Sequence, residues 1–353
     1  MMKNNLYGST RKALREMAKE MGEPAYRGDQ LFGWLHHKTI RSADEMTNVP
    51  AGLRARLSDC SFGLPEPMTV QEEPGGRTIK ATMELEDGSV IEGVCMRYSR
   101  PSARNRNTAC ISSQVGCAME CSFCATGRLG FIRNLTPGEI VGQVHVLNRL
   151  LGERDPEARI TNVVFMGMGE PLANLEAVLM ALDVLHDPEG LDIGYRKITV
   201  STCGLVPGIH SLAREALPLT LAVSLQAPRN ELRDRLMPVN RRYPLEALMP
   251  ACHAYFEATG RKITLEYVLL GNLNDHDREA RELAGLVAGL HCQVNLIQFN
   301  PVKDTPYGPS RRLEQFRGLL DTAGVEVSIR EEMGQSIDAA CGQLRGREGA
   351  QPS

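Results

Sequence analysis

The sequence predicts an α/β protein, namely a partial (β/α) barrel preceded by a small N-terminal α+β module. From about residue 108, short apolar runs typical of strands alternate with stretches of helical periodicity, which is the pattern of a parallel sheet covered by helices. Before that point, helical spacing dominates residues 9–59 and strand-like alternation dominates residues 68–97. We therefore expect three regions: an N-terminal accessory module at 1–95, the barrel domain at 96–345 and a disordered tail at 346–353.

The N-terminal module has two parts. Its strand part contains Asp87-Gly88 between two alternating runs, and this dipeptide is a strong short-range signal for a β-hairpin. In its helical part, apolar side chains recur every three or four residues, as on one face of a helix: Leu14, Met17 and Met21, then Leu31, Trp34 and Leu35.

The barrel domain is expected to alternate strands with helices. Its first helix begins with Thr136-Pro137-Gly138-Glu139, which supplies an N-cap, a proline at the first helical position and the glutamate of a capping box. The predicted strands are 109–113, 161–166, 197–202, 219–224, 263–269, 293–299 and 325–329. The predicted helices are 137–151, 174–186, 245–258, 275–289 and 311–323.

The composition is that of an ordinary globular protein. The 353 residues include 42% hydrophobic and 24% charged residues, with 40 Lys and Arg against 43 Asp and Glu, so the net charge is −3. This balance excludes a uniformly basic nucleic-acid coat protein but not a local basic patch. No apolar run approaches a membrane span or the core of a signal peptide, so we expect a cytoplasmic protein without a membrane partner.

Three of the ten cysteines stand close together. Cys117, Cys121 and Cys124 form a C-x3-C-x2-C run just after the first barrel strand. In a reducing compartment such a run indicates metal or catalytic chemistry rather than disulfides. Three thiolates on one loop can hold three irons of a 4Fe-4S cluster and leave the fourth iron open for a ligand. A structural zinc site needs a fourth ligand, which this loop lacks, so a zinc knuckle completed from elsewhere is the second interpretation.

A glycine-rich segment follows the strand at 161–166. It reads Met166-Gly167-Met168-Gly169-Glu170-Pro171, and glycines allow a ligand to approach the backbone closely. Together with the cysteine run, this segment resembles the S-adenosylmethionine (SAM) binding segment of the radical SAM superfamily, in which the glutamate takes the SAM amino group. The barrel is then expected to be of the radical SAM type.

The resemblance narrows to one family. CISSQVGC at 110–117, CATGRLGFIRNLTPGEI at 124–140, FMGMGEPLANL at 165–175, MPVNRRYPL at 237–245 and AACGQL at 339–344 are similar to the motifs of the RlmN/Cfr family of RNA adenine methyltransferases. The similarity extends over essentially the whole chain, including Trp34 and DEMTNVP at 44–50.

This resemblance implies a role for individual residues. Cys341 matches the cysteine that is methylated, Cys110 matches the resolving cysteine, and Glu92 matches the acidic residue proposed to accept a proton. Each of these residues also has an interpretation without a catalytic role. Cys110 could be a buried thiol of its strand, Cys341 a cysteine without a function, and Glu92 a residue on the solvent face of its strand. The cluster ligands would be Cys117, Cys121 and Cys124. The SAM contacts would be Gly169, Glu170, Ser201, Ser224, Leu225, Gln226 and Asn300.

The chemistry implied by the family explains why these parts are needed. The C2 and C8 carbons of adenine are electron-poor and cannot attack a SAM methyl group directly. Cys341 therefore takes a methyl group from one SAM, and a second SAM, cleaved reductively, activates that methyl for addition to the ring. Glu92 removes the ring proton, and Cys110 attacks Cys341 to form a transient disulfide and release the RNA.

Two positions depart from the family's pattern. Gln226 stands where histidine is common, and Cys203 stands where serine is frequent. In addition, the link at 98–107 is longer than usual and could displace Glu92 relative to the cluster.

The expected partners are RNAs. Between residues 97 and 134 there are six arginines and one acid, so a positive rim around the cysteine loop is expected, with an ordinary solvated loop as the alternative. The resemblance implies 2-methyladenine formation in 23S ribosomal RNA at the peptidyl-transferase centre and in tRNA next to the anticodon. It also implies a monomer and an electron donor such as flavodoxin, and we expect the N-terminal module to assist RNA docking.

Three alternatives stay open at this point. The closest is C8 methylation of the ribosomal adenine, as in the Cfr branch, because both branches share the quoted motifs. Another radical SAM reaction, such as sulfur insertion, would bring further cluster cysteines. A zinc-binding, RNA-binding protein without catalysis would need no role for Cys341.

Overall fold

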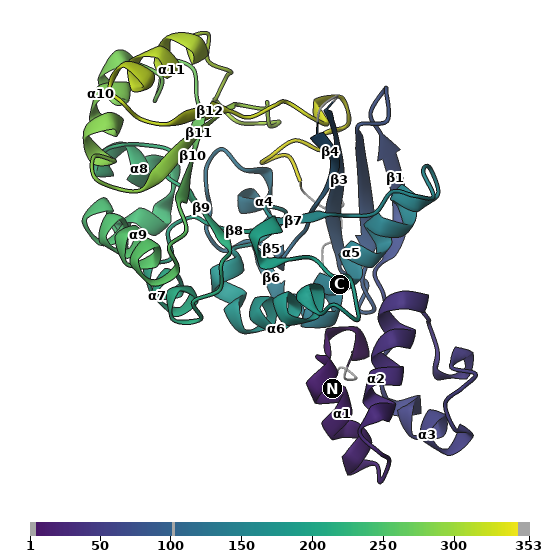
Figure 1. Cartoon of the computed structure of the whole chain (residues 1–353). Coiled ribbons are helices and arrows are strands. Elements are labelled where there is room, and N and C mark those ends of the chain that lie inside the picture. Colours follow the sequence, from purple (N-terminus) through teal and green to yellow (C-terminus); the bar gives the residue numbers. More distant parts are fainter. Residues whose placement is uncertain (1–4, 101–102, 345–353) are drawn as a thin grey trace.

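A computed structural model describes residues 5–100 and 103–344 of the chain (Figure 1). The predicted α/β architecture is confirmed: a large, mostly parallel sheet is covered by helices, and a group of helices precedes it. The tail predicted to be disordered, 346–353, lies outside the described residues. In the part of the chain that is described, no helix has the length and apolar character needed to cross a bilayer.

The main sheet has ten strands in the order β1-β2-β3-β4-β7-β8-β9-β10-β11-β12. From β4 to β12 all neighbouring strands are parallel, whereas β1 to β4 pair in an antiparallel manner. Among the described strands, β1 and β12 each have one neighbour, so the barrel is open. The strands are β1 (Glu66–Glu72), β2 (Thr78–Glu84), β3 (Val90–Arg100), β4 (Ala103–Cys110), β7 (Asn162–Phe165), β8 (Ile198–Thr202), β9 (Thr220–Ser224), β10 (Ile263–Leu269), β11 (Cys292–Gln298) and β12 (Val327–Ile329).

The first barrel strand differs from the prediction. It was expected at 109–113, but β4 ends at Cys110 and begins at Ala103, because the polar residues before Cys110 pair with β3. After Cys110, the chain leaves the sheet and enters the short strand β5 (Gln114–Gly116), which pairs with β6 (Phe131–Asn134). The predicted hairpin around Asp87-Gly88 is confirmed and joins β2 to β3, with Gly88 at φ +80°.

Helices follow the strands along the outer side of the curved sheet (Figure 1). The capping box predicted at the start of α5 is confirmed, since Thr136 accepts from the Glu139 amide at 3.2 Å and Glu139 accepts from the Thr136 amide at 2.7 Å. The helices around the sheet are α4 (Ala125–Arg128), α5 (Pro137–Gly152), α6 (Leu175–His186), α7 (Val206–Arg214), α8 (Asn230–Leu236), α9 (Leu245–Thr259), α10 (Asp277–Leu286) and α11 (Leu313–Thr322). The sequence prediction did not include α4, α7 or α8.

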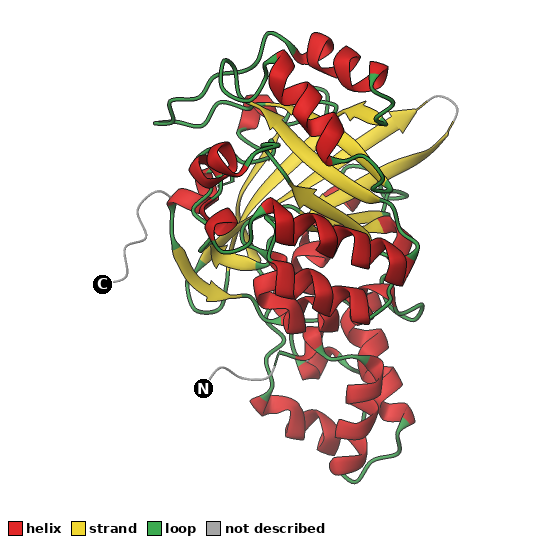
Figure 2. Ribbon diagram, turned by 90° about the vertical axis from the view of Figure 1, so that its left-hand side faces the viewer, coloured by secondary structure: helices red, strands yellow, loops and turns green. Residues whose placement is uncertain are grey.

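The N-terminal helices project from one end of the molecule in both views (Figures 1 and 2). They are α1 (Arg11–Glu20), α2 (Tyr26–Gly33) and α3 (Ala51–Arg56). A buried aromatic contact joins them to the barrel: the ring of Tyr7 packs edge-on against His36, after α2, and His145 of α5. A Cβ on Gly8 would lie 2.4 Å from the Gly138 nitrogen, so the two segments meet at backbone contact distance.

Candidate active site

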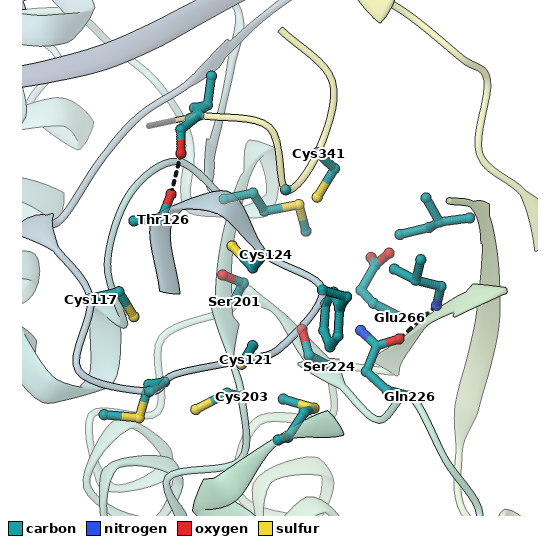
Figure 3. Close-up of a pocket in the computed structure, with 18 of the residues that line it drawn as sticks. Cys117, Cys121, Cys124, Thr126, Ser201, Cys203, Ser224, Gln226, Glu266 and Cys341 are labelled. Carbon is teal, nitrogen blue, oxygen red and sulfur yellow. Dashed lines mark hydrogen bonds between the residues drawn. The ribbon is translucent and has the colours of Figure 1, made fainter. Parts of the chain in front are cut away.

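A cavity, here called the main cavity, opens at the carboxyl ends of the parallel strands (Figure 3). Parallel α/β sheets place binding sites at this edge, because the loops that follow the strands converge there. The main cavity is lined by the cysteine loop and by residues from the ends of β7 to β12. It contains nearly all of the predicted site residues: Cys117, Cys121, Cys124, Gly169, Glu170, Ser201, Ser224, Gln226, Asn300 and Cys341.

The cysteine loop connects β5 to α4 and is held on both sides. The Ser122 amide donates to the Leu236 carbonyl at 3.0 Å, and the Ala125 amide donates to the Gly342 carbonyl at 2.8 Å. Gly127 allows α4 to lie against the loop, because a Cβ there would come within 2.9 Å of the Cys121 nitrogen. Burial raises the pKa of the Cys117 thiol to about 12, and the pKa of Cys121 is raised by burial and by its neighbouring thiols.

These residues fit an iron-sulfur cluster. Three thiols from one short loop line a single cavity that continues past them, so a cluster held there keeps one side open. The sulfurs of a zinc site lie within about 4 Å of one another, since zinc–sulfur bonds are about 2.3 Å long. Among the described residues, no three Cys, His, Asp or Glu side chains converge closely enough to hold a single metal ion.

The glycine-rich segment follows β7 and forms one wall of the main cavity. Gly169 has φ +101°, and a Cβ there would come within 2.6 Å of the Gln114 side chain, so only glycine fits. Glu170 is buried, and its carboxylate accepts from the amides of Leu172 at 3.0 Å and Cys203 at 2.7 Å. Burial raises the pKa of Glu170, and these amide hydrogen bonds act against that shift.

The other predicted cofactor residues lie at or just after the ends of β8, β9 and β11. Ser201 donates to the Phe165 carbonyl at 2.5 Å, and Asn300 accepts from the Gln335 side chain at 2.9 Å. Gln226 has φ +63°, and its Oε1 accepts from the Val268 amide at 2.6 Å, so its side-chain NH2 is the part free to face the cavity. Leu225 is fully buried in the core and does not line the cavity.

Cys341 and Cys110 meet at a second, smaller cavity, here called the side cavity. It adjoins the main cavity, and Cys341 lines both. Cys110 ends β4 and Cys341 lies on the segment after β12, so the fold brings together two cysteines 231 positions apart in the sequence. Burial raises the pKa of the Cys110 thiol to about 12, whereas Cys341 is exposed.

Glu92 lies on β3 and is buried, so the alternative that it faces solvent is wrong. Its Oε1 is 2.9 Å from Nζ of Lys80 on the neighbouring strand β2. The same ammonium donates to the Asp338 carbonyl at 3.1 Å, three residues before Cys341. Glu92 is not among the residues that line either cavity, and its link to the site runs through Lys80.

Two charged residues of the site were missed by the sequence analysis. Glu266 lies within the apolar strand β10, and Arg330 directly follows β12. Both line the main cavity, and Arg330 also lines the side cavity. A charge inside an otherwise apolar parallel strand, as in ITLEYVL at 263–269, is the signal that could have revealed Glu266, because such strands are buried on both faces.

The arginines predicted to form a positive rim have different surroundings. Arg97 pairs with Asp155 at 3.1 Å, and Arg133 pairs with both Asp87 and Glu139. Arg106 and Arg128 are exposed and form no ion pair within 4 Å among the described residues. The side chains of Arg100 and Arg104 lie outside the described residues.

Known proteins are similar to this chain over nearly its whole length. The profile of the radical SAM superfamily matches residues 111–284, and that of the ribosomal RNA large subunit methyltransferase N-terminal domain matches residues 4–62. A probable dual-specificity RNA methyltransferase RlmN of Moorella thermoacetica is 49% identical over 97% of this chain and 97% of its own length. The protein of that name in Desulforamulus reducens is 45% identical over 98% of this chain and 97% of its own. The crystal structure of a radical SAM methyltransferase from Sphaerobacter thermophilus superimposes with a TM-score of 0.91 at 44% identity, covering 98% of this chain and 100% of that one.

Proposed function

Because the chain belongs to the radical SAM superfamily and, within it, to the RlmN family of RNA methyltransferases, we propose that it forms 2-methyladenine in 23S ribosomal RNA and in tRNA. The sites would be the peptidyl-transferase centre and the nucleotide next to the anticodon. This membership removes the support for a zinc-binding protein without catalysis. The relatives' shared description as dual-specificity enzymes supports two classes of RNA substrate.

The proposed cofactors are one 4Fe-4S cluster and two molecules of SAM per turnover. Cys117, Cys121 and Cys124 would hold the cluster, and the SAM contacts would come from the wall of the main cavity: Gly169, Glu170, Ser201, Ser224, Leu225, Gln226 and Asn300. Leu225 would contribute through its backbone, since its side chain is in the core. When bound, the cluster and SAM supply a methyl group and one-electron radical chemistry.

The chain's own residues carry the methyl group and release it. Cys341 accepts the methyl on its sulfur and presents it where the main and side cavities meet. Glu92 is the residue that the family resemblance assigns to the ring proton, and it would have to leave its ion pair with Lys80 to reach the base from outside the two cavities. Cys110 then attacks the Cys341 sulfur, and the disulfide that forms frees the methylated base.

One observation supports this assignment above all others: Cys110 and Cys341 line the same cavity, and that cavity adjoins the one lined by the three-cysteine loop. A methyltransferase that worked by direct displacement would need neither a second cysteine nor this adjacency. We further propose a monomeric cytoplasmic enzyme, reduced by a donor such as flavodoxin, whose residues 1–95 assist RNA docking. The boundary expected between an N-terminal module at 1–95 and a barrel domain at 96–345 falls inside β3, whose sheet continues from β1 into the barrel.

The first test is the intact mass of the denatured protein after anaerobic cluster reconstitution and supply of SAM. We expect one added methyl group, about 14 Da, on the wild-type chain, assigned by peptide mass to Cys341. Cys341→Ala should lack it, whereas Cys60→Ala, a thiol outside both cavities, should keep it. An unmethylated Cys341 in cluster-loaded, SAM-supplied protein would contradict methyl transfer through this residue.

The target carbon needs a second measurement. The isomers 2-methyladenosine and 8-methyladenosine differ in chromatographic retention, so digested RNA from a reaction with the reconstituted enzyme separates them against synthetic standards. We expect the 2-methyl isomer in both the ribosomal RNA and the tRNA. The 8-methyl isomer in ribosomal RNA alone would support the Cfr-like alternative.

A further inference from the structure

Arg330 places a positive charge beside both mechanistic cysteines. Its amide donates to the Leu296 carbonyl of β11 at 2.9 Å, which fixes the backbone at the carboxyl end of β12. The side chain lines the main cavity and the side cavity at once, and it shares the side cavity with Cys110 and Cys341.

The Arg330 guanidinium is incompletely paired. Its Nη2 donates to the sulfur of Met166 at 3.2 Å, a weak acceptor. Its Nη1 lies 3.7 Å from the Glu266 carboxylate, beyond hydrogen-bond distance, and has no hydrogen bond within the described residues although it is buried. Glu266 in turn accepts from the Asn295 side chain at 2.8 Å. A buried donor without a partner is costly, so this nitrogen is set to interact with a group that appears during the reaction.

Cys110 requires such a partner. The nucleophile in thiol exchange is the thiolate, yet burial raises the pKa of Cys110 to about 12, and Arg330 is the cation that opposes this shift. Cys341, the other titratable group facing Cys110, raises the pKa further. Glu266 and Tyr98 face Arg330, and Glu331 and Glu332 also line the side cavity.

We propose that Arg330 is a positioning residue for the resolution step, in which its guanidinium stabilises the Cys110 thiolate as it attacks Cys341. The inference rests on the proposed function. In this step the Cys110 sulfur bonds to the Cys341 sulfur, and the bond from the Cys341 sulfur to the methylene carbon on adenine breaks. The electron pair goes to the carbon, which takes one proton to become a methyl group. The two sulfurs are oxidised to a disulfide and the carbon is reduced, so no other oxidant is needed.

The test measures the covalent adduct between protein and RNA that precedes resolution. Reconstituted wild type, Cys110→Ala, Arg330→Met and Arg330→Lys are incubated with SAM, dithionite and a 23S ribosomal RNA fragment, then separated on a denaturing gel. Because Arg330 also lines the main cavity with Cys341, the adduct is counted per chain that carries the Cys341 methyl by intact mass, and on that basis we expect Arg330→Met to accumulate at least tenfold more adduct than wild type. Arg330→Lys, which retains the charge, should restore most of the resolution.

A pH profile separates this role from a structural one. Raising the pH from 7 to 9 should speed the decay of the Arg330→Met adduct by about tenfold or more, because the thiolate fraction of Cys110 grows with pH. The Cys110→Ala adduct should stay stable over the same range. Adduct in Cys110→Ala but none in methylated Arg330→Met would overturn the inference, as would accumulation in Arg330→Lys equal to that in Arg330→Met. Absence of adduct from Cys110→Ala itself would overturn the proposed resolution by Cys110, and the inference with it.

Discussion

His36 and His145 stack with their ring centroids 5.3 Å apart where the N-terminal helices meet α5, and both are almost fully buried. Their facing nitrogens are 3.1 Å apart, which requires one ring to donate and the other to accept. Burial lowers the pKa of both, that of His145 to about 4. The hydrogen bond between the two rings therefore requires that both are neutral, and protonation of either ring destabilises the contact.

This pair predicts a loss of stability in mild acid. A histidine whose folded pKa is below its unfolded value of about 6.5 contributes stability above that value, and the contribution disappears as the pH falls from about 6.5 toward 4. For His145 the full effect is up to about 3 kcal/mol in the free energy of unfolding.

The measurement compares urea unfolding at pH 7.5 and 5. We expect His145→Gln to lose less stability over this interval than wild type. His210→Gln, at an exposed histidine on α7, should behave like wild type. Equal pH dependence in all three proteins would contradict the assignment.

Site residues that are neighbours in the chain could be predicted from the sequence, whereas those that depend on distant partners could not. That Cys117, Cys121 and Cys124 share one site could be predicted because they are neighbours in the chain. Arg330 could not, because its significance depends on its hydrogen bond to Met166 and on sharing the side cavity with Cys110, residues that are 164 and 220 positions away. The role of Gln226 could be predicted in part. Its place at the end of β9 follows from the strand pattern, but its hydrogen bond to the Val268 amide depends on the register between β9 and β10.

At the scale of elements, the antiparallel strands added to the barrel reach the active site. Lys80 of β2 contacts Glu92 of β3 and the carbonyl of Asp338, so one ammonium joins the added strands to the segment that carries Cys341. The other end of that segment is held by Thr126 of α4, which donates to the Leu344 carbonyl at 2.5 Å.

Lys80→Met should therefore loosen the segment from Gly334 to Leu344. We expect backbone amides in this segment to exchange with deuterium about tenfold faster than in wild type, because one of its anchors is lost. Lys262→Met is the matched control, since Lys262 makes an exposed ion pair with Glu326 away from the segment. Unchanged deuterium exchange in Lys80→Met would contradict this prediction, because it would show that the other contacts hold the segment in place without Lys80.

The elements that were predicted closely carry their pattern in their own residues, and this includes short strands such as β10, which matches the predicted 263–269. α5 and α9 begin and end within two residues of the prediction because their apolar patterns extend over about four turns. α7 was missed because Pro207 and Gly208 interrupt its first turn and suggest a loop. β4 was misplaced because its polar first half is a strand only through pairing with β3, which no local pattern reveals.

At the scale of the whole molecule, a net charge of −3 must be reconciled with binding to a polyanion. Two exposed arginines, Arg106 on β4 and Arg128 on α4, supply local positive charge. The Arg106 guanidinium lies over the Tyr98 ring, 4.0 Å from its centroid, and Arg128 donates to the Lys303 and Asp304 carbonyls. Both side chains are exposed and have no acidic partner among the described residues. Such cations are available to phosphates.

We expect Arg106→Gln together with Arg128→Gln to weaken RNA binding and to reduce its dependence on salt. Each lost phosphate contact should lower the slope of log K against log salt by about 1. The control replaces Arg278 and Arg281 with Gln on α10, where both are exposed and paired with acids. Filter binding of a 23S ribosomal RNA fragment at several salt concentrations makes the measurement, and equal slopes in both double variants would contradict the expectation.

The position of Cys341 after the last strand also has a consequence for synthesis. A nascent chain long enough to form all ten strands of the sheet and the three-cysteine loop still lacks Cys341, the proposed methyl acceptor, because that residue follows β12 in chain order. Contacts that close the site span 218 and 258 positions, and pairings of such long range form late. The three-cysteine loop is thus complete in the growing chain before the residue proposed to carry the methyl group has been made.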